Sequence, residues 1–453
     1  MNGKELVLAA LEARPTPRVP WVPFTGVQIG SLRGYTATEL LLSSDKLVEC
    51  GIEAKRLYRT DGQPVIFDLQ IEAEILGCEL QWADEAPPSV ISHPLASGYE
   101  PLENLAMPTP EDGRLPIVLD AMARLKEAIG EDTALYGLVC GPFTLAMHLR
   151  GTNLFLDMFD SPDQVKELIA KCREVTQTVA AYYVDAGMDV IAVVDPMISQ
   201  ISAEHFAEFV KTESRILFQA LRELGVHSCY FVCGNATPLL AEMAQCGPDG
   251  ISVDENVPLA EARKVAREYG ISFGGNIPLT TVLLLGQPVD CIGMALELIE
   301  NHNDTGFILS PGCDMPYNAP ADNVAAISLA VLEPEKARQF VDMHEKREEV
   351  EVEVAMPDYE NLTHPLIEVF TIDSATCPPC KYMVDATQRV AEHIAGPVDW
   401  VEHKATSPES IQRMKLLGVA NLPTIVVNGK ITFVSVIPDL PTYVKAVRAA
   451  QGQ

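Results

Sequence analysis

Short apolar segments alternate with longer amphipathic ones along roughly the first three quarters of the chain. The longer segments place apolar residues three or four positions apart and end at glycine, as in residues 161–187 and 258–270, which is typical of helices. The short segments have the length and composition of buried strands. There are eight of them: residues 20–24, 64–69, 135–140, 189–195, 229–233, 250–254, 271–276 and 307–313.

This alternation predicts an α/β fold, a parallel (β/α)8 TIM barrel, over residues 1–343. A doubly wound parallel sheet is the alternative arrangement of the same elements. Residues 344–363 are acidic and have no sustained apolar face, which predicts a linker.

Residues 364–453 follow a different order and predict a second, smaller α/β domain. Its expected elements are a strand at 366–372, the turn Cys377-Pro378-Pro379-Cys380, a helix from about Lys381, a strand at 399–404, a helix at 410–418, a hairpin turning at Asn428-Gly429 and a final helix.

Composition limits the partners of the protein. The chain has 63 acidic and 33 basic residues, a formal net charge of −30, which repels phosphate backbones and anionic membrane surfaces. The N-terminus has no signal-type apolar core, and no apolar run approaches the roughly 18 residues that span a bilayer. We therefore expect a cytoplasmic protein without nucleic-acid or membrane partners.

The chain contains 11 cysteines, an odd number scattered along its length. This pattern favours reactive or metal-binding thiols over a secreted disulfide framework. The pair at Cys377 and Cys380 stands between a predicted strand and a predicted helix, where the positive end of the helix dipole stabilises a thiolate. Half of a zinc knuckle is the alternative, but the predicted domain has no second close cysteine pair.

The Cys-Pro-Pro-Cys turn after the first strand, together with Leu422-Pro423-Thr424 at the start of a later one, resembles the thioredoxin superfamily over roughly residues 364–450. The resemblance implies a cis bond before Pro423, beside the cysteine pair. It also implies that Cys377 is the nucleophile and Cys380 the resolving thiol.

In a TIM barrel the chemistry takes place at the carboxyl ends of the strands. The predicted strands end in polar residues or cysteines, which singly are more often helix caps or packed thiols but which the fold would gather together. Among them and just after them we select Asp68 and Asp195 as candidate catalytic residues and Asn235, Asp254 and Asn276 as candidate binding residues.

Residues 66–80, 140–151, 232–235 and 308–316 resemble the uroporphyrinogen decarboxylase superfamily, and most closely its methylcobamide:coenzyme M methyltransferase branch. That branch binds zinc through a His-x-Cys pair and a later cysteine, and Cys233 and Cys313 stand at the matching cysteine positions. Zinc in such a site holds a thiol substrate as the thiolate, ready to accept a methyl group from methyl-cobalt.

The sequence departs from that branch at the expected histidine, where it has Phe231. A set of Cys229, Cys233 and Cys313 is an alternative, because Cys229 lies on the same strand face. However, about 13 Å of extended strand separates Cys229 from Cys233, too far for one ion with bonds of roughly 2.3 Å unless the strand breaks. Other possible ligands are Cys140, Glu72 and Glu74.

A decarboxylase is a further alternative that the residues disfavour. Asp68 matches the aspartate that contacts the tetrapyrrole in that branch, but only Arg33 stands where paired arginines are expected. His148 replaces a tyrosine, and Cys313 replaces the histidine of the last loop. A substrate with many carboxylates would also meet a strongly acidic protein.

The resemblance therefore implies a methyltransferase that works with the cobamide of a separate corrinoid protein, because no part of the chain resembles a corrinoid-binding module. With zinc the expected substrate is a thiol. Without zinc, the expected substrate is a methylated amine, ether or thioether that is activated by an acid such as Asp68.

Alternatively, the barrel is a degenerate binding module, and the Cys377–Cys380 redox pair is the active site. In a third arrangement, the redox pair keeps the barrel cysteines reduced.

Overall fold

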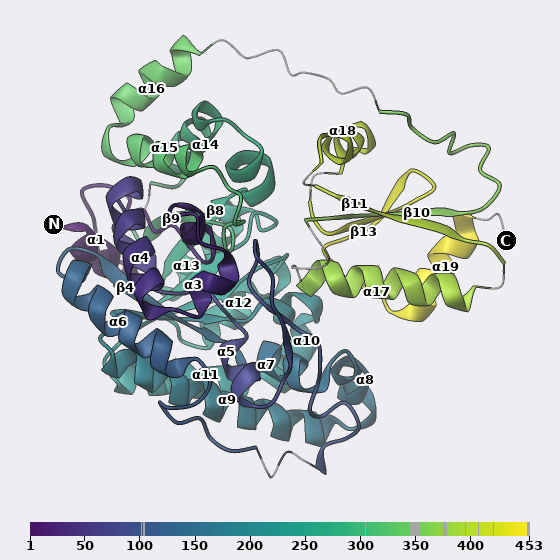
Figure 1. Cartoon of the computed structure of the whole chain (residues 1–453), viewed down its shortest axis with the longest axis horizontal. Coiled ribbons are helices and arrows are strands. Elements are labelled where there is room, and N and C mark those ends of the chain that lie inside the picture. Colours follow the sequence, from purple (N-terminus) through teal and green to yellow (C-terminus); the bar gives the residue numbers. More distant parts are fainter. Residues whose placement is uncertain are drawn as a thin grey trace. The chain divides into compact units, whose positions relative to one another are not determined.

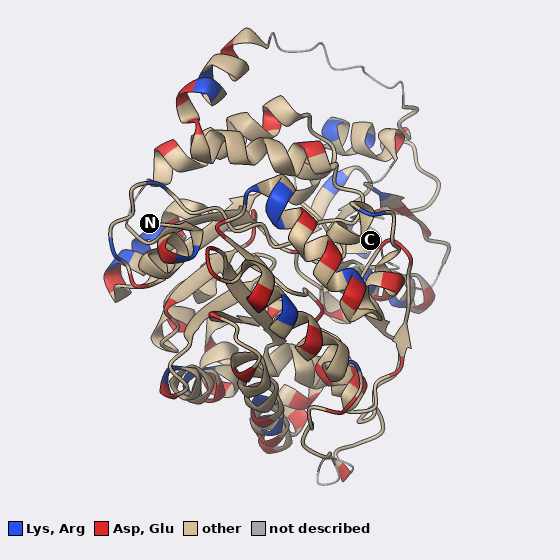
Figure 2. Cartoon of the chain, turned by 60° about the vertical axis from the view of Figure 1, so that its left-hand side comes forward, with Lys and Arg blue, Asp and Glu red and all other residues tan. Residues whose placement is uncertain are grey.

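The computed structural model describes residues 1–450 except 101, 103–104, 304, 345–353, 373, 375–377, 395, 406 and 420. The chain divides into two compact units, Met1–Glu345 and Lys346–Gln453, which are described separately (Figure 1). Charged residues lie mainly on helices and loops (Figure 2). Among the described residues, no helix has both the length and the apolar character needed to cross a membrane.

The first unit contains a seven-stranded parallel sheet in the order β1-β4-β5-β6-β7-β8-β9. Its strands are β1 Gly62–Pro64, β4 Ala134–Cys140, β5 Val190–Val194, β6 His227–Val232, β7 Gly250–Val253, β8 Ser272–Ile277 and β9 Phe307–Pro311. The small pair β2 Leu80–Gln81 and β3 Ser89–Val90 lies outside this sheet.

The residues around Trp21 close the sheet into a barrel. Trp21 pairs in parallel with Leu309 of β9, and the N–H of Val22 donates to the carbonyl oxygen of Leu309 over 3.0 Å. On the other side, the N–H of Asp61 donates to the carbonyl oxygen of Trp21 over 2.9 Å. The Asp61 carboxylate in turn accepts from the N–H of Trp21 and from Arg18. The unit therefore has the predicted TIM-barrel-like fold.

Helices surround the strands, and their ends follow local chemistry. Ser43 caps α4 by accepting from the N–H of Lys46, and α13 stops where Gly270 takes a φ of 68°. The helices are α1 Gly3–Leu11, α2 Gln28–Ser31, α3 Ala37–Leu41, α4 Ser44–Tyr58, α5 Ile71–Ile75, α6 Leu115–Ile129, α7 Pro142–Arg150, α8 Asn153–Asp160, α9 Pro162–Asp185, α10 Ala203–His205, α11 Lys211–Glu223, α12 Leu240–Gln245, α13 Leu259–Tyr269, α14 Pro288–His302, α15 Ala321–Leu332 and α16 Pro334–Met343.

Two predicted strands are shorter than expected. The segment 20–24 forms a single bridge at Trp21, because the prolines on either side of residues 21 and 22 have no N–H for a ladder. The strand predicted at 64–69 is β1, which already ends at Pro64. Asp68 accepts from the N–H of Gln70 over 2.9 Å, a local turn that leads the chain into α5.

Aromatic side chains fill part of the barrel interior. The ring of Phe231 lies 4.5 Å from that of Phe24 and 5.8 Å from that of Phe67, measured between centroids. Cys229 and Phe231 share this buried cluster, and Cys233 packs against it. Alternate residues of β6 therefore face the interior, as period-two alternation predicts.

The second unit has a four-stranded sheet in the order β11-β10-β12-β13. Strand β10 pairs in parallel with β11 and antiparallel with β12, and β12 pairs antiparallel with β13. The predicted turn at Asn428-Gly429 is confirmed, with φ of 47° and 74° at the two residues. The elements are β10 Leu366–Thr371, α17 Pro378–His393, β11 Asp399–Lys404, α18 Pro408–Leu417, β12 Thr424–Val427, β13 Lys430–Val434 and α19 Leu440–Ala450.

Part of the segment predicted as a linker is bound to the second unit. The hydroxyl of Tyr359 donates to the buried carboxylate of Glu368 over 2.6 Å, and Arg413 donates to the carbonyl oxygen of Ala355 over 2.8 Å. Glu368 also accepts from His403 and Arg413. Burial opposes ionisation of Glu368, but these hydrogen bonds lower its pKa.

Candidate functional site at the barrel mouth

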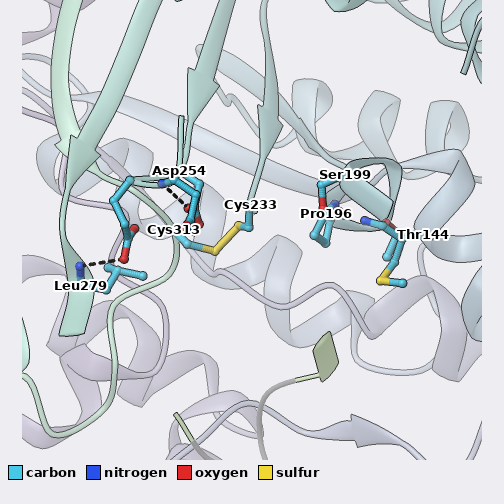
Figure 3. The surroundings of a disulfide bond; sticks show 10 residues. Thr144, Pro196, Ser199, Cys233, Asp254, Leu279 and Cys313 are labelled. Atoms are coloured by element: carbon cyan, nitrogen blue, oxygen red, sulfur yellow. Dashed lines mark hydrogen bonds between the residues drawn. A yellow bond between two sulfur atoms is a disulfide. The ribbon is translucent and has the colours of Figure 1, made fainter. Parts of the chain in front are cut away.

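We call the loops that follow the carboxyl ends of the barrel strands the barrel mouth. Cys233 follows β6 and Cys313 follows β9, and their sulfur atoms form a disulfide with a Cα–Cα distance of 5.8 Å (Figure 3). Both cysteines are partly exposed. The fold thus brings together two predicted site residues that are 80 positions apart in the sequence.

The residues present do not fit a three-ligand zinc site. Phe231 has no donor atom, and its ring is held in the aromatic cluster. Cys229 is buried in the same cluster as Phe231, below the partly exposed Cys233 and Cys313. Among the described residues, no three His, Cys, Asp or Glu side chains are grouped to hold a metal ion. The predicted set of Cys229, Cys233 and Cys313 is therefore not assembled as a metal centre.

Two carboxyl groups lie beside the disulfide, at the end of β7. The buried Asp254 carboxylate accepts from the N–H groups of Gly234 and Asn256, and burial raises its pKa (Figure 3). Glu255 accepts from the N–H of Leu279 over 3.3 Å. Burial, and then the charge of Asp254, raise the pKa of Glu255 to about 8.

Glu255 approaches the Cys313 loop closely because residue 312 is glycine. A Cβ atom on Gly312 would lie 2.2 Å from Oε2 and 2.8 Å from the backbone nitrogen of Glu255, so a side chain at this position would force Glu255 to move. That oxygen is buried and has no hydrogen-bond partner among the described residues. The sequence reasoning missed Glu255, although its position directly after the strand-end residue Asp254 was a usable signal.

Asp195 has a structural role at the start of α7. Its buried carboxylate accepts from the N–H of Phe143 and from the N–H and hydroxyl of Thr144. Burial raises the pKa of Asp195 to about 6, although these hydrogen bonds oppose the shift. Since the carboxylate is occupied with a helix N-terminus, a catalytic role for Asp195 stays a prediction.

The two predicted asparagines also have local partners. The side-chain amide of Asn276 donates to the carbonyl oxygens of Asp254 and Val257 over 3.1 and 2.8 Å, which fixes the loop after β7. Asn235 is exposed, and its side chain accepts from the N–H of Thr237 over 3.2 Å. Asn276 therefore supports the mouth, and Asn235 forms a turn beside it.

Asp68 is buried and ion-paired. Its Oδ2 accepts from Arg114 over 2.5 Å, and Arg114 also donates to Glu74 over 2.7 Å. Burial by itself lowers the pKa of the Arg114 guanidinium, but the carboxylates of Asp68 and Glu74 raise it overall. Sequence reasoning missed Arg114, because nothing in its local pattern links it to a residue 46 positions earlier.

Two further side chains near this ion pair, Glu72 and His148, are buried, which the sequence did not predict. Glu72, expected on a solvated helix face, is buried and accepts from the N–H of Cys140 over 3.0 Å. Burial raises the pKa of Glu72 to about 8. His148 is also buried, and burial lowers its pKa to about 4, so its ring is neutral.

The second unit holds the other candidate residues. Cys380 is buried in the first turn of α17 and is disulfide-bonded. The Leu422–Pro423 bond is cis, as the resemblance implied. Cys377 lies outside the described residues, so its role as a nucleophile stays a prediction.

Comparison with known proteins identifies the first unit. Residues 2–334 match the family model described as Uroporphyrinogen decarboxylase (URO-D), and the chain belongs to this family. The chain is 29% identical over 328 residues to the methylcobamide:CoM methyltransferase MtbA of Methanosarcina acetivorans, covering 71% of the chain and 95% of that protein. It is 28% identical over 338 residues to MtaA of Methanosarcina barkeri, also named a methylcobamide:CoM methyltransferase, covering 72% and 96%.

A solved structure shows the same likeness. The structure of a methyltransferase from Methanosarcina mazei superposes with a TM-score of 0.67 at 26% identity, covering 75% of this chain and 99% of that one. The resemblance to the methyltransferase branch is therefore supported over the barrel. The thioredoxin resemblance of the second unit stays a prediction.

The position of Phe231 predicts how a metal site can be restored. Phe231→His places a nitrogen ligand two residues before Cys233, so the reduced variant should bind about one equivalent of zinc, whereas the reduced wild type binds far less. Metal analysis after gel filtration measures this, with Phe231→Leu as the control. Equal zinc in both variants, with both thiols shown to be free, would contradict the prediction.

Burial of Glu72 predicts a pH-dependent stability. Its folded pKa of about 8 lies above the ordinary 4.5, so the folded state keeps a proton that the unfolded state releases. Between these values, the wild type should lose stability relative to Glu72→Gln as pH rises, by at most about 1.4 kcal/mol per pH unit. Urea unfolding from pH 5 to 8 measures it, with the exposed Glu79→Gln as the control. A pH-independent difference would count against a buried neutral Glu72.

Proposed function

We propose that the barrel is a methyltransferase that moves a methyl group between the cobamide of a separate corrinoid protein and a small substrate. The observation that carries this proposal is the match with almost the whole length of proteins named methylcobamide:CoM methyltransferases. The likeness to a solved methyltransferase over 99% of its chain supports it. Cys233 and Cys313, which the resemblance places at metal-ligand positions, meet at the barrel mouth.

A thiol is the substrate class that this mouth fits best. A methyl group on cobalt is electrophilic, and a thiolate is the soft nucleophile that accepts it, forming a sulfur–carbon bond while the bonding electron pair stays on cobalt. The side chains of Cys233 and Cys313 line the position for the thiol. Asp254 and Glu255 lie beside them and can accept its proton, and an apolar cluster packs against both cysteines.

A non-thiol substrate would need an acid that protonates its leaving group, and Asp68 was the expected candidate. Oδ2 of Asp68 is engaged by Arg114 in a buried ion pair, so this carboxylate is not free to contact a leaving group. The thiol version of the proposal therefore has the better support.

Methyl transfer is tested with free methylcobalamin and 2-mercaptoethanesulfonate under excess dithiol. The full-length protein should convert methyl-cobalt to the demethylated form and yield the methylated thiol, followed by absorbance and mass spectrometry. Cys233→Ala and Cys313→Ala should lower kcat/KM at least roughly tenfold, because they remove the lining of the thiol position.

Cys291→Ser is the matched control. Cys291 is a buried cysteine on α14 whose sulfur contacts the carbonyl oxygen of Val282, and a serine hydroxyl can keep that hydrogen bond. This variant should retain the wild-type rate. Absence of demethylation by the wild type with several different thiols would refute the proposal.

We further propose that the second unit is a thiol–disulfide exchange domain built on Cys377 and Cys380. Two features support it: the mixed sheet and the buried Cys380 at the start of α17. The amide groups in the first turn of α17 stabilise a nearby thiolate.

This second activity is measured as reduction of insulin disulfides with a dithiol as the electron source. Cys377→Ser should lower the rate at least roughly tenfold, because the attacking thiolate is lost. Cys291→Ser again serves as the control. Equal rates for the wild type and Cys377→Ser would show that the pair is not redox-active.

A further inference from the structure

The disulfide between Cys233 and Cys313 stands where the methyltransferase resemblance places metal ligands. Two sulfur atoms that are bonded to each other have no thiolate to offer a metal, and the described residues supply no third ligand group. The pair therefore needs a chemical role other than the one implied by the family resemblance.

Access distinguishes this pair from the other barrel cysteines. The seven free cysteines that the structure describes are all buried, whereas Cys233 and Cys313 are partly exposed. Thiol–disulfide exchange requires an attacking sulfur to reach one of the two bonded sulfurs in line. Among the cysteines described in the barrel, these two are thus the ones that are not fully buried.

The surroundings also suit exchange. The N–H of Gly234, directly after Cys233, is held by the Asp254 carboxylate, and Gly312, directly before Cys313, packs against Glu255. Both cysteines therefore stand on anchored loops, so the two sulfurs remain neighbours when the bond is broken and can form it again. Buried carboxyl groups on the same side can supply or accept the proton that exchange moves.

We propose that Cys233 and Cys313 form a redox-active dithiol/disulfide centre at the barrel mouth, whose electron donor is a dithiol. This inference goes beyond the proposed methyl transfer and does not depend on it. A donor thiolate attacks one cysteine sulfur, forming a mixed disulfide and releasing the other cysteine as a thiolate, which takes up a proton. The second donor thiol, after losing its proton, attacks the mixed disulfide and frees the first cysteine.

The exchange transfers two electrons and two protons from the donor dithiol to the Cys233–Cys313 pair. The donor is oxidised from a dithiol to a disulfide, and the protein pair is reduced from a disulfide to two thiols. Only the reduced state leaves both sulfurs able to act on a substrate in the mouth.

The experiment follows the two cysteines in the folded, full-length protein, purified without reductant. Free thiols are blocked with one alkylating agent, disulfides are then reduced and labelled with a heavier agent, and both peptides are quantified by mass spectrometry. We expect both peptides to carry the heavy label at first. Dithiothreitol should convert them to the light form at least roughly tenfold faster than an equal concentration of a monothiol, because its second step is intramolecular. Oxidised dithiothreitol should restore the bond.

Two variants and a parallel measurement control the result. Cys291→Ser should behave as the wild type, and Cys313→Ser should show Cys233 in the light form from the start. The Cys377→Ser variant distinguishes the donors: slower conversion means that the Cys-x-x-Cys pair of the chain relays electrons, and an unchanged rate means direct reduction by the external dithiol. Demethylation of methylcobalamin is assayed separately, so failure of either proposal is recognised independently.

Three outcomes overturn the inference. In the first outcome, both peptides carry the light label in protein purified without reductant, which means that no disulfide exists. In the second outcome, the Cys233–Cys313 bond resists dithiothreitol until the protein unfolds, which makes it a structural disulfide. Alternatively, the reduced wild type can bind about one equivalent of zinc that Cys233→Ser and Cys313→Ser both lose, which makes the pair part of a metal site.

Discussion

Closure of the barrel at Trp21 is the constraint on which the candidate site depends. The segment around Trp21 has no ladder of its own, and it joins β9 to the chain before β1 through a few backbone hydrogen bonds. The Asp61 carboxylate stabilises this junction by accepting from the N–H of Trp21 and from Arg18. With the sheet closed, the ends of β6 and β9 face one interior, and Cys233 and Cys313 can meet.

Phe231 is part of the aromatic packing of that interior. The resemblance implied a metal-binding histidine at this position, but the ring of Phe231 packs against Phe24 and Phe67. An apolar ring in this place stabilises the barrel interior and removes a ligand at once. Phenylalanine at position 231 therefore contributes packing and no metal ligand, and the sulfurs of Cys233 and Cys313 are bonded to each other.

The fold was predictable because its signal is local, whereas much of the site was not. Apolar runs and glycine ends mark the strands and helices. The prediction at residues 20–24 failed because prolines remove ladder donors, and the strand predicted at 64–69 ends early where Asp68 forms a turn. Cys233 and Cys313 were found through a resemblance. Arg114 and Glu255 were not, because their roles depend on partners distant in the sequence, Asp68 for one and Gly312 for the other. Asp195 and Asn276 were selected for their positions, but the structure occupies their side chains with backbone groups.

The disulfide has a geometric consequence that follows from the strand order. Strands β7 and β8 stand between β6 and β9 in the sheet, so the bond joins strands that are not neighbours. The disulfide therefore crosses part of the barrel opening instead of following its edge from one strand to the next. The oxidation state of two sulfur atoms thus determines whether a covalent bond links two strand ends that the sheet itself does not pair.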